Sequence, residues 1–147
     1  MHAAAASGLG FLLSVLWFDL MFDVQARGTR ADLPAEVRDS IAGYYRRVTT
    51  AARPMNRLVA LAMLVTLAAI AGELVTDAVP AAGAWISLVL AGAAIGLAAS
   101  RTVRNAVRLG AQVDDPARQS TLARSILRDH LACLGAIAVA LVLQVAA

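Results

Sequence analysis

Apolar residues concentrate in four long segments of the chain, near residues 3–24, 57–79, 84–100 and 129–147. A bilayer core of about 30 Å is crossed by about 20 helical residues. The first two segments reach that length, whereas the third and fourth are shorter and need flanking residues or a locally thin bilayer. The pattern therefore predicts four membrane helices in one integral membrane domain over residues 1–147.

The two polar stretches that connect these segments, 25–56 and 101–128, are also predicted to be helical. In the first stretch, apolar residues recur every three or four positions after Asp32, which we expect to cap a helix that Pro54 bends or ends. In the second stretch, Asp115 and Pro116 predict a helix start, and that helix runs unbroken into the fourth apolar segment.

Composition and charge support a membrane protein. Hydrophobic residues make up 60% of the chain and charged residues only 16%. All 13 basic residues are arginines, and they fall between residues 27 and 57 or between 101 and 128. Cytoplasmic loops of membrane proteins retain positive charge. We therefore expect a multi-pass protein of the inner membrane, with cytoplasmic connectors and both termini outside the cytoplasm.

The first 26 residues also invite comparison with a secretory signal peptide. They contain no basic residue, and Asp19 and Asp23 interrupt the apolar stretch near its end. Signal peptides begin with positive charge and have an uninterrupted apolar core. We therefore expect the first helix to be retained.

The two connectors share a spaced pattern at an offset of 71 residues. The repeated positions are Arg47, Thr50, Ala52, Arg53 and Arg57 in the first copy and Arg118, Thr121, Ala123, Arg124 and Arg128 in the second. Each copy precedes or enters a long apolar segment. The pattern favours a parallel internal duplication about an axis along the membrane normal, and chance similarity of two arginine-rich, alanine-rich helices is the alternative.

Polar residues lie at a similar depth on all four predicted membrane helices, at their cytoplasmic ends. They are Asp19, Asp23, Asn56, Arg57, Arg101, Asn105, Arg128, Asp129 and His130. One hypothesis is that arginines of this cluster neutralise Asp19 and Asp23, since buried carboxylates need paired charges. The other is a metal site of Asp19, Asp23 and His130, with Asp129 or Cys133 nearby. We expect no cofactor.

Glu73 is an intramembrane carboxylate on the side that has no arginine, one helical turn before Asp77. Ionisable residues within membrane segments often mark ion or proton pathways. The third segment is rich in small residues, and Gly92 and Gly96 form a G-x-x-x-G pattern. This pattern permits close helix packing, which we expect within the bundle, with a homodimer as the alternative.

A second candidate surface lies on the connectors, where basic and aromatic residues can meet anionic lipid headgroups or another anionic ligand. Its residues are Tyr44, Tyr45, Arg46, Arg47, Arg53 and Arg124. No nucleic-acid recognition motif accompanies these arginines, so we expect no nucleic-acid partner.

The leading functional hypothesis is a non-enzymatic protein that anchors a partner or anionic lipid, or supports a membrane assembly, through the cytoplasmic arginine and carboxylate cluster. An alternative is a small transporter or channel that uses Glu73 and Asp19 with Asp23 as coupling sites. A third is a metal-dependent membrane oxidoreductase. The sequence contains no glycine-rich phosphate loop or nucleophile elbow, and its single cysteine excludes an intrachain disulfide.

Overall fold

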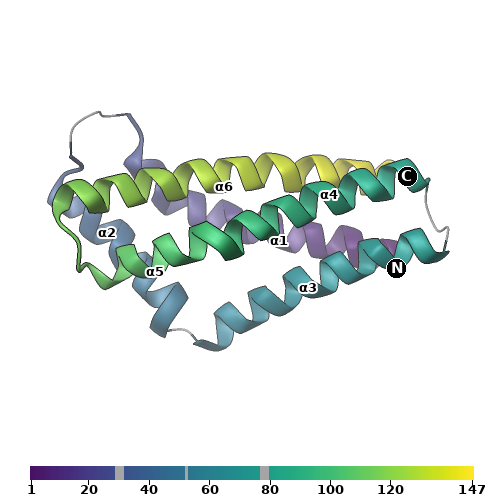
Figure 1. Ribbon diagram of the computed structural model, residues 1–147, viewed down its shortest axis with the longest axis horizontal. Helices are drawn as coiled ribbons and strands as arrows, with labels where there is room; N and C mark the ends of the chain where they lie inside the picture. Colours follow the sequence, from purple (N-terminus) through teal and green to yellow (C-terminus); the bar gives the residue numbers. More distant parts are fainter. Residues whose placement is uncertain (29–31, 52, 77–79) are drawn as a thin grey trace.

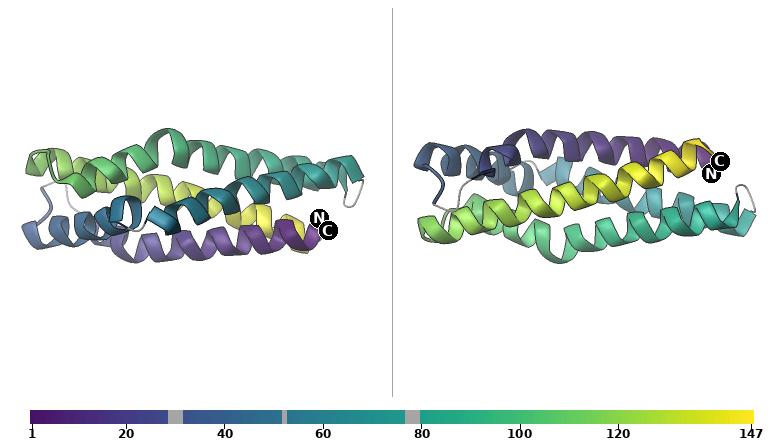
Figure 2. Two further views of the ribbon diagram at one scale, coloured as in Figure 1. Left: turned by 90° about the horizontal axis from the view of Figure 1, so that it is seen from below. Right: turned by 90° about the horizontal axis from the view of Figure 1, so that it is seen from above.

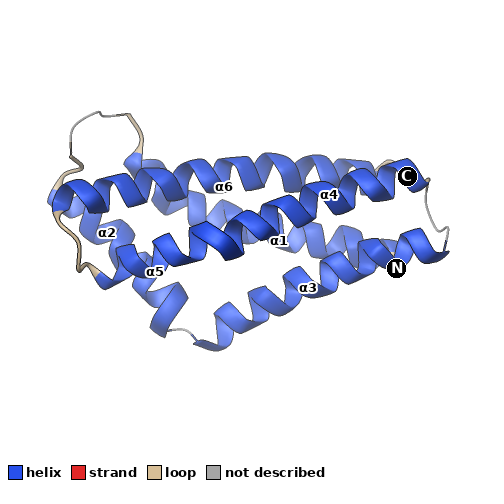
Figure 3. Ribbon diagram, viewed as in Figure 1, coloured by secondary structure: helices blue, strands red, loops and turns tan. Residues whose placement is uncertain are grey.

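The computed structural model describes residues 1–28, 32–51, 53–76 and 80–147, and all regular structure within them is helical (Figures 1 and 3). The elements in chain order are α1 (His2–Asp23), η1 (Val24–Ala26), α2 (Ala35–Tyr45), η2 (Arg46–Ala51), α3 (Arg53–Thr76), α4 (Ala81–Leu97), η3 (Ala98–Thr102), α5 (Val103–Ala111) and α6 (Pro116–Val145). Here η1 is a 3₁₀-helix, and η2 and η3 are π-helical turns.

The four long helices α1, α3, α4 and α6 form an antiparallel bundle (Figures 1 and 2). Helices α1 and α4 each pack against both α3 and α6. Both chain termini lie at one end of the bundle, here called the terminal end. The two connectors lie at the other, here called the connector end.

Four helical stretches are long and apolar enough to cross a membrane: His2–Ala26, Asn56–Thr76, Ala81–Ala111 and Pro116–Val145. The four predicted segments are thus confirmed as helices. The third continues to Ala111 and does not end near residue 100, because the intervening residues include no proline to break it. The fourth begins at Pro116 and runs unbroken for 30 residues, as predicted, which is about 45 Å at 1.5 Å per residue.

The helix starts in the connectors follow the local sequence. Asp115 caps α6, and its side chain accepts a hydrogen bond of 2.8 Å from the backbone N–H of Arg118, as predicted. The predicted cap at Asp32 is wrong, since α2 begins at Ala35 with Pro34 as its N-cap. Leu33 precedes Pro34, and helical backbone angles are unfavourable for a residue before proline. Helix α2 therefore does not start earlier. Helix α3 has Pro54 in its first turn, which agrees with the predicted break.

Two separate hydrophobic clusters stabilise the two halves of the bundle. The cluster of the connector half joins α1, η1, α2, α5 and α6 with the segment before α2, through Leu20, Ala26, Leu33, Ile41, Ala42, Tyr45, Ala106, Leu109, Leu122, Ala123, Ile126 and Leu127. The cluster of the terminal half joins the four long helices through Ala5, Leu9, Leu12, Ala69, Ile70, Ala91, Ala94, Cys133, Ile137 and Ala140. On α6, the buried Asp129 and His130 lie between Leu127 of the first cluster and Cys133 of the second.

Two glycines allow close helix packing. A Cβ atom at Gly8 would lie 2.1 Å from Thr66 Oγ1, so α1 and α3 approach closely there. A Cβ atom at Gly110 would lie 2.8 Å from the backbone nitrogen of Arg46. At Gly92 and Gly96, by contrast, a Cβ atom would meet nothing within 4 Å. The predicted packing of this G-x-x-x-G pattern within the bundle is therefore wrong.

Candidate functional site

Three helices bring the most unusual polar side chains together, between the two hydrophobic clusters. Asp19 and Asp23 lie one turn apart on α1 and therefore share a face. Tyr44 and Tyr45 end α2, and His130 lies near the middle of α6. Each tyrosine contacts one aspartate, and the histidine lies beside both.

The geometry of this cluster centres on Asp23, which is fully buried. Tyr45 donates its hydroxyl to Asp23 Oδ1 at 2.7 Å, and His130 Nδ1 lies 2.6 Å from Asp23 Oδ2. Tyr44 donates to Asp19 Oδ1 at 2.6 Å. His130 Nε2 lies 3.9 Å from Asp19 Oδ2, which is too far for a direct hydrogen bond. The imidazole is therefore fixed on its Nδ1 side and unbonded toward Asp19.

The electrostatics of the tyrosines favour their role as donors. Burial raises the pKa of Tyr45 well above its ordinary value, and the charges of Asp23 and Asp19 raise it further. Burial also raises the pKa of Tyr44, and its hydrogen bond to Asp19 adds to the effect. The Tyr44 ring stacks on Phe22, with ring centroids 4.1 Å apart. Both hydroxyls therefore stay protonated and hold the carboxylates in place.

These partners correct one sequence-based hypothesis. In the described part of the chain, Asp19 and Asp23 are satisfied by His130 and two tyrosines and not by an arginine. Such neighbours suit a buried carboxylate because hydrogen bonds offset part of the free energy of removing its charge from water.

Asp129 forms a second polar centre, on the other side of α6. Its side chain is 1% exposed and pairs with Arg101 through both carboxylate oxygens, with Arg101 Nε 2.9 Å from Oδ2. Thr102 donates its hydroxyl to the same oxygen at 3.1 Å. The Arg101 side chain is 54% exposed. This bidentate pair ties α6 to the π-helical turn η3, and we assign it a structural role.

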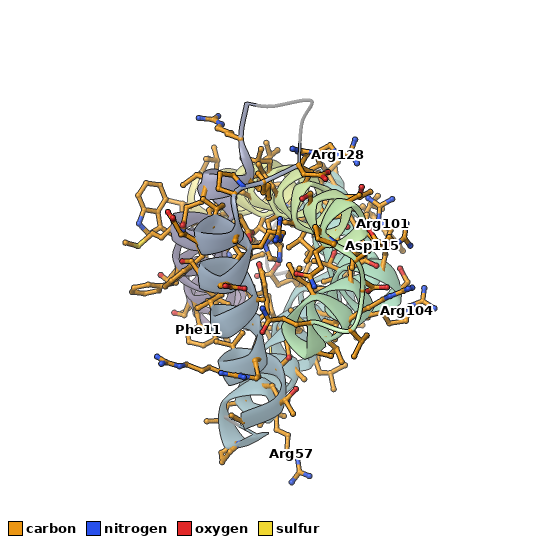
Figure 4. All side chains as sticks on the ribbon, turned by 90° about the vertical axis from the view of Figure 1, so that its left-hand side faces the viewer. Phe11, Arg57, Arg101, Arg104, Asp115 and Arg128 are labelled. Carbon is orange, nitrogen blue, oxygen red and sulfur yellow. The ribbon has the colours of Figure 1, made fainter. Side chains whose placement is uncertain are left out.

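Four other residues of the predicted cluster lie apart from the observed group of aspartates, tyrosines and His130. Asn56 and Arg57 are exposed at the start of α3, and Asn56 donates to the backbone carbonyl of Thr49 at 3.0 Å. Arg128 is exposed on α6. Figure 4, which views the connector end, shows Arg57 and Arg128 on opposite sides of the bundle. Asn105 is partly buried.

The residues predicted to contact lipid are divided by the structure. Arg46 and Arg47 are exposed, and Arg124 is partly buried. The side chain of Arg53 lies outside the described residues. Tyr44 and Tyr45 point inward to the aspartates and so belong to the polar cluster.

A cavity of about 150 Å³ opens beside this cluster, among all four long helices. Its polar wall is made of Asp19, Tyr45, Thr49, Thr102 and His130. The rest of its lining is apolar and comprises Leu12, Val15, Leu16, Val48, Val59, Met63, Ala94, Ile95, Ala98, Val103, Ala106, Cys133 and Ile137. The cavity thus combines an apolar chamber with a hydrogen-bonding wall, the usual composition of a small-molecule site.

The same geometry bears on the metal hypothesis. Among the described residues, no group of three histidine, cysteine or acidic side chains is arranged to hold a metal ion. His130 Nδ1, the nearest imidazole nitrogen to Asp23, is engaged in a short hydrogen bond with it.

Glu73 lies far from this cluster, near the terminal end of α3, and is fully buried. Gln144 of α6 donates to Glu73 Oε2 at 2.8 Å, and His2 Nδ1 lies 3.3 Å from Glu73 Oε1. Neither partner was predicted, although Gln144 follows Glu73 by 71 residues, the offset of the repeated pattern. Asp77, its predicted neighbour, lies outside the described residues.

Sequence reasoning placed the two tyrosines on the lipid-facing surface and missed their contacts with the aspartates. A usable signal was present, since Tyr44 belongs to the apolar stripe of its helix and buried tyrosine hydroxyls need a partner. Thr102 gave no such signal, because threonine is common at exposed helix positions.

No family model, curated protein or solved structure matches this chain.

Proposed function

We propose that this is an integral protein of the inner membrane that holds a small, largely apolar molecule in the cavity beside His130. The observation that supports the proposal is the cavity itself, whose apolar walls end at an imidazole, a carboxyl group and three hydroxyl groups. A site that only joined helices would need no such space, because protein interiors are packed without sizeable voids.

The size of the cavity limits the class of ligand. Apolar cavities of about 150 Å³ in proteins accept a molecule as large as benzene. The volume here is the same. The polar wall adds a place for one hydrogen-bonding group. A single-ring molecule with one hydroxyl group, such as a phenol, meets both requirements.

His130 is the residue that we expect to meet that hydroxyl. In the neutral imidazole, donation of the Nδ1 proton to Asp23 across 2.6 Å leaves the lone pair on Nε2. That nitrogen is on the side of Asp19, which also lines the cavity. The ligand hydroxyl donates to Nε2, while Asp23 and Tyr45 hold the ring and stabilise any positive charge that it gains.

Binding can be tested by thermal unfolding of the detergent-purified protein with phenol or with toluene. At a phenol concentration of 100 times Kd, the stabilisation is about 2.7 kcal/mol. We expect phenol to stabilise the protein more than toluene does. Ala94→Leu, which fills the cavity, should remove the effect, and Ala93→Leu, one position along on the exposed face, should keep it. Equal stabilisation of both variants would contradict the proposal.

The membrane topology is part of the proposal. Four helices of sufficient length and apolarity, with all arginines between residues 27 and 57 or 101 and 128, support cytoplasmic connectors. Both termini would then lie outside the cytoplasm. A cysteine-accessibility assay on intact cells tests this: a cysteine at exposed Val113 should be protected, and one at exposed Ala147 labelled.

Exposed arginines at the connector end favour a second function, contact with anionic lipid or an anionic partner. Arg57, Arg104 and Arg128 project outward in Figure 4, and Arg46 and Arg47 are exposed as well. Each such charge near an anionic surface contributes about 1 kcal/mol. Since Asp23 is buried and Asp19 is partly buried with a tyrosine as its partner, this anchoring would rest on the arginines alone. Native mass spectrometry for retained anionic lipid, with Arg46→Gln and Arg47→Gln, tests it.

The arrangement of the helices supports the internal duplication. A two-fold axis along the bundle would exchange α1 with α4 and α3 with α6, and the observed packing of α1 and α4 against both α3 and α6 has this symmetry. Glu73 and Gln144, which would be equivalent positions, are hydrogen-bonded to each other. Equivalent residues meet in this way close to a two-fold axis.

A further inference from the structure

The buried polar group at the terminal end is the part of the molecule that the proposed function leaves unexplained. Glu73 and Gln144 are 0% and 1% exposed, and His2 is partly exposed beside them. The three side chains come from α3, α6 and α1. One hydrogen bond, from Gln144 Nε2 to Glu73 Oε2, joins the first two.

The remaining polar atoms of this group have no partner among the described residues. They are Glu73 Oε1, Gln144 Oε1 and His2 Nδ1. The 3.3 Å contact between His2 Nδ1 and Glu73 Oε1 is close enough for an ion pair, but its geometry is not that of a hydrogen bond. Glu73 Oε1 and Gln144 Oε1 only accept hydrogen bonds, and His2 Nδ1 accepts one in the tautomer that carries its proton on Nε2. Two buried oxygens therefore lack a donor, and in that tautomer the imidazole nitrogen lacks one too.

The charged residues near Glu73 in the sequence also include no arginine or lysine that could neutralise its carboxylate. No arginine or lysine occurs between residues 58 and 100 or after residue 128. Helix α4 contains no titratable side chain, α6 contributes the neutral Gln144 here, and α1 contributes His2 beside the N-terminal amine. Asp77 lies outside the described residues. An isolated ionised carboxylate in apolar surroundings has a high free energy and takes up a proton or a counter-ion.

A proton fits this site better than a metal cation does. Sodium and calcium ions require about six oxygen ligands, and this site offers the two Glu73 oxygens and one amide oxygen. A proton on Glu73 Oε1 requires a single acceptor, and both His2 Nδ1 and Gln144 Oε1 are free to accept. His2, which is 41% exposed, connects the buried carboxyl with the solvent of the terminal end.

We propose that Glu73, Gln144 and His2 form a proton-binding site at the terminal end of the bundle, with His2 as the group that exchanges the proton with solvent. Glu73 Oε1 holds the proton, Gln144 fixes Oε2, and the imidazole accepts the proton when the carboxyl releases it. The O–H bond of the carboxyl breaks as the N–H bond of the imidazolium forms, so the charge stays within the site. This site is independent of the cavity beside His130.

The test is infrared spectroscopy of the protein in vesicles, read at the carbonyl stretch of a protonated carboxyl group. The chain has two glutamates, Glu36 and Glu73, and Glu36 is exposed on α2. The variant Glu36→Gln, grown with ¹³C-labelled glutamate, therefore contains one labelled carboxyl side chain, that of Glu73. The labelled Glu36→Gln variant retains Glu73, so the test does not depend on whether Glu73→Gln folds.

We expect an isotope-shifted band of a protonated carboxyl that fades as the external pH rises and is absent from Glu73→Gln. In His2→Ala the same band should shift more slowly when the vesicles are moved from H₂O to D₂O, because the side chain that exchanges the proton with solvent is gone. A carboxylate band alone at every pH would overturn the proton site. If the band behaves in His2→Ala as it does in the unmodified protein, the role of His2 is overturned.

Discussion

The packing of α1 against α3 leads to a prediction about Gly8 that has a matched control on the same helix. A Cβ atom at Gly8 would lie 2.1 Å from Thr66 Oγ1, 3.0 Å from its Cβ and 3.2 Å from its Cγ2. Rotation of Thr66 breaks its 2.7 Å hydrogen bond to the Ala62 carbonyl and leaves the 3.0 Å contact with its Cβ, so relief needs a shift of the helices by roughly 1 Å toward normal contact distances. Overpacking of this kind destabilises proteins by about 1–3 kcal/mol.

Gly10 provides the matched control, two residues along the same helix, where a Cβ atom would meet nothing within 4 Å. Both Gly→Ala substitutions gain about 1 kcal/mol of helix propensity, so Gly10→Ala should be neutral or stabilising. Gly8→Ala should be less stable than Gly10→Ala by about 1–3 kcal/mol. Unfolding in mixed micelles measures both. Equal stabilities would refute the close approach of the two helices.

A double-mutant cycle strengthens the test. Thr66→Ala removes the two side-chain atoms beyond Cβ, and only the 3.0 Å contact with Cβ remains. The effect of Gly8→Ala should therefore shrink markedly in the Thr66→Ala background, with a coupling of about 1–2 kcal/mol between the two sites. Additive effects would show that strain at this contact does not cause the loss of stability.

Three further predictions concern the connector end. Gly110→Ala should destabilise the protein in thermal unfolding, because its Cβ would meet backbone atoms, whereas Gly43→Ala, with no atom within 4 Å, should not. Tyr45→Phe should lower the free energy of unfolding by about 1.5–3 kcal/mol, since it removes a hydrogen bond to a buried carboxylate, and an unchanged value would argue against that bond. Arg101→Gln should destabilise the protein measurably because it leaves the buried carboxylate of Asp129 without its cation, while exposed Arg104→Gln should change stability by less than about 0.5 kcal/mol.

The helices could be predicted because their signals are local. Runs of apolar residues, the cap at Asp115 and the proline at 116 fix where chain segments become helical. The end of the third helix could not be placed, because polar Ser100 and Arg101 resemble the edge of a membrane segment. Polar residues do not break a helix when they reach solvent or a partner, and Arg101 reaches Asp129.

The site was predictable only in part. The i, i+4 spacing of Asp19 and Asp23 and the depth of His130 indicated a shared polar level, and the structure places them side by side. The rotation of α2, which turns Tyr44 and Tyr45 inward, depends on packing with other helices. The cavity depends on how side chains of all four helices fit together, and no local pattern records such volumes.

The measurement that tests the central claim most directly is ¹⁵N NMR of the histidine side chains, with His2→Ala leaving His130 as the only imidazole. The account predicts a protonated Nδ1 in a short hydrogen bond and a lone pair on Nε2. Phenol should shift the Nε2 resonance, toluene should leave it nearly unchanged, and Ala94→Leu should abolish the phenol response. If phenol, at concentrations that stabilise the protein, leaves the chemical shift of Nε2 unchanged, the placement of the ligand against His130 is contradicted.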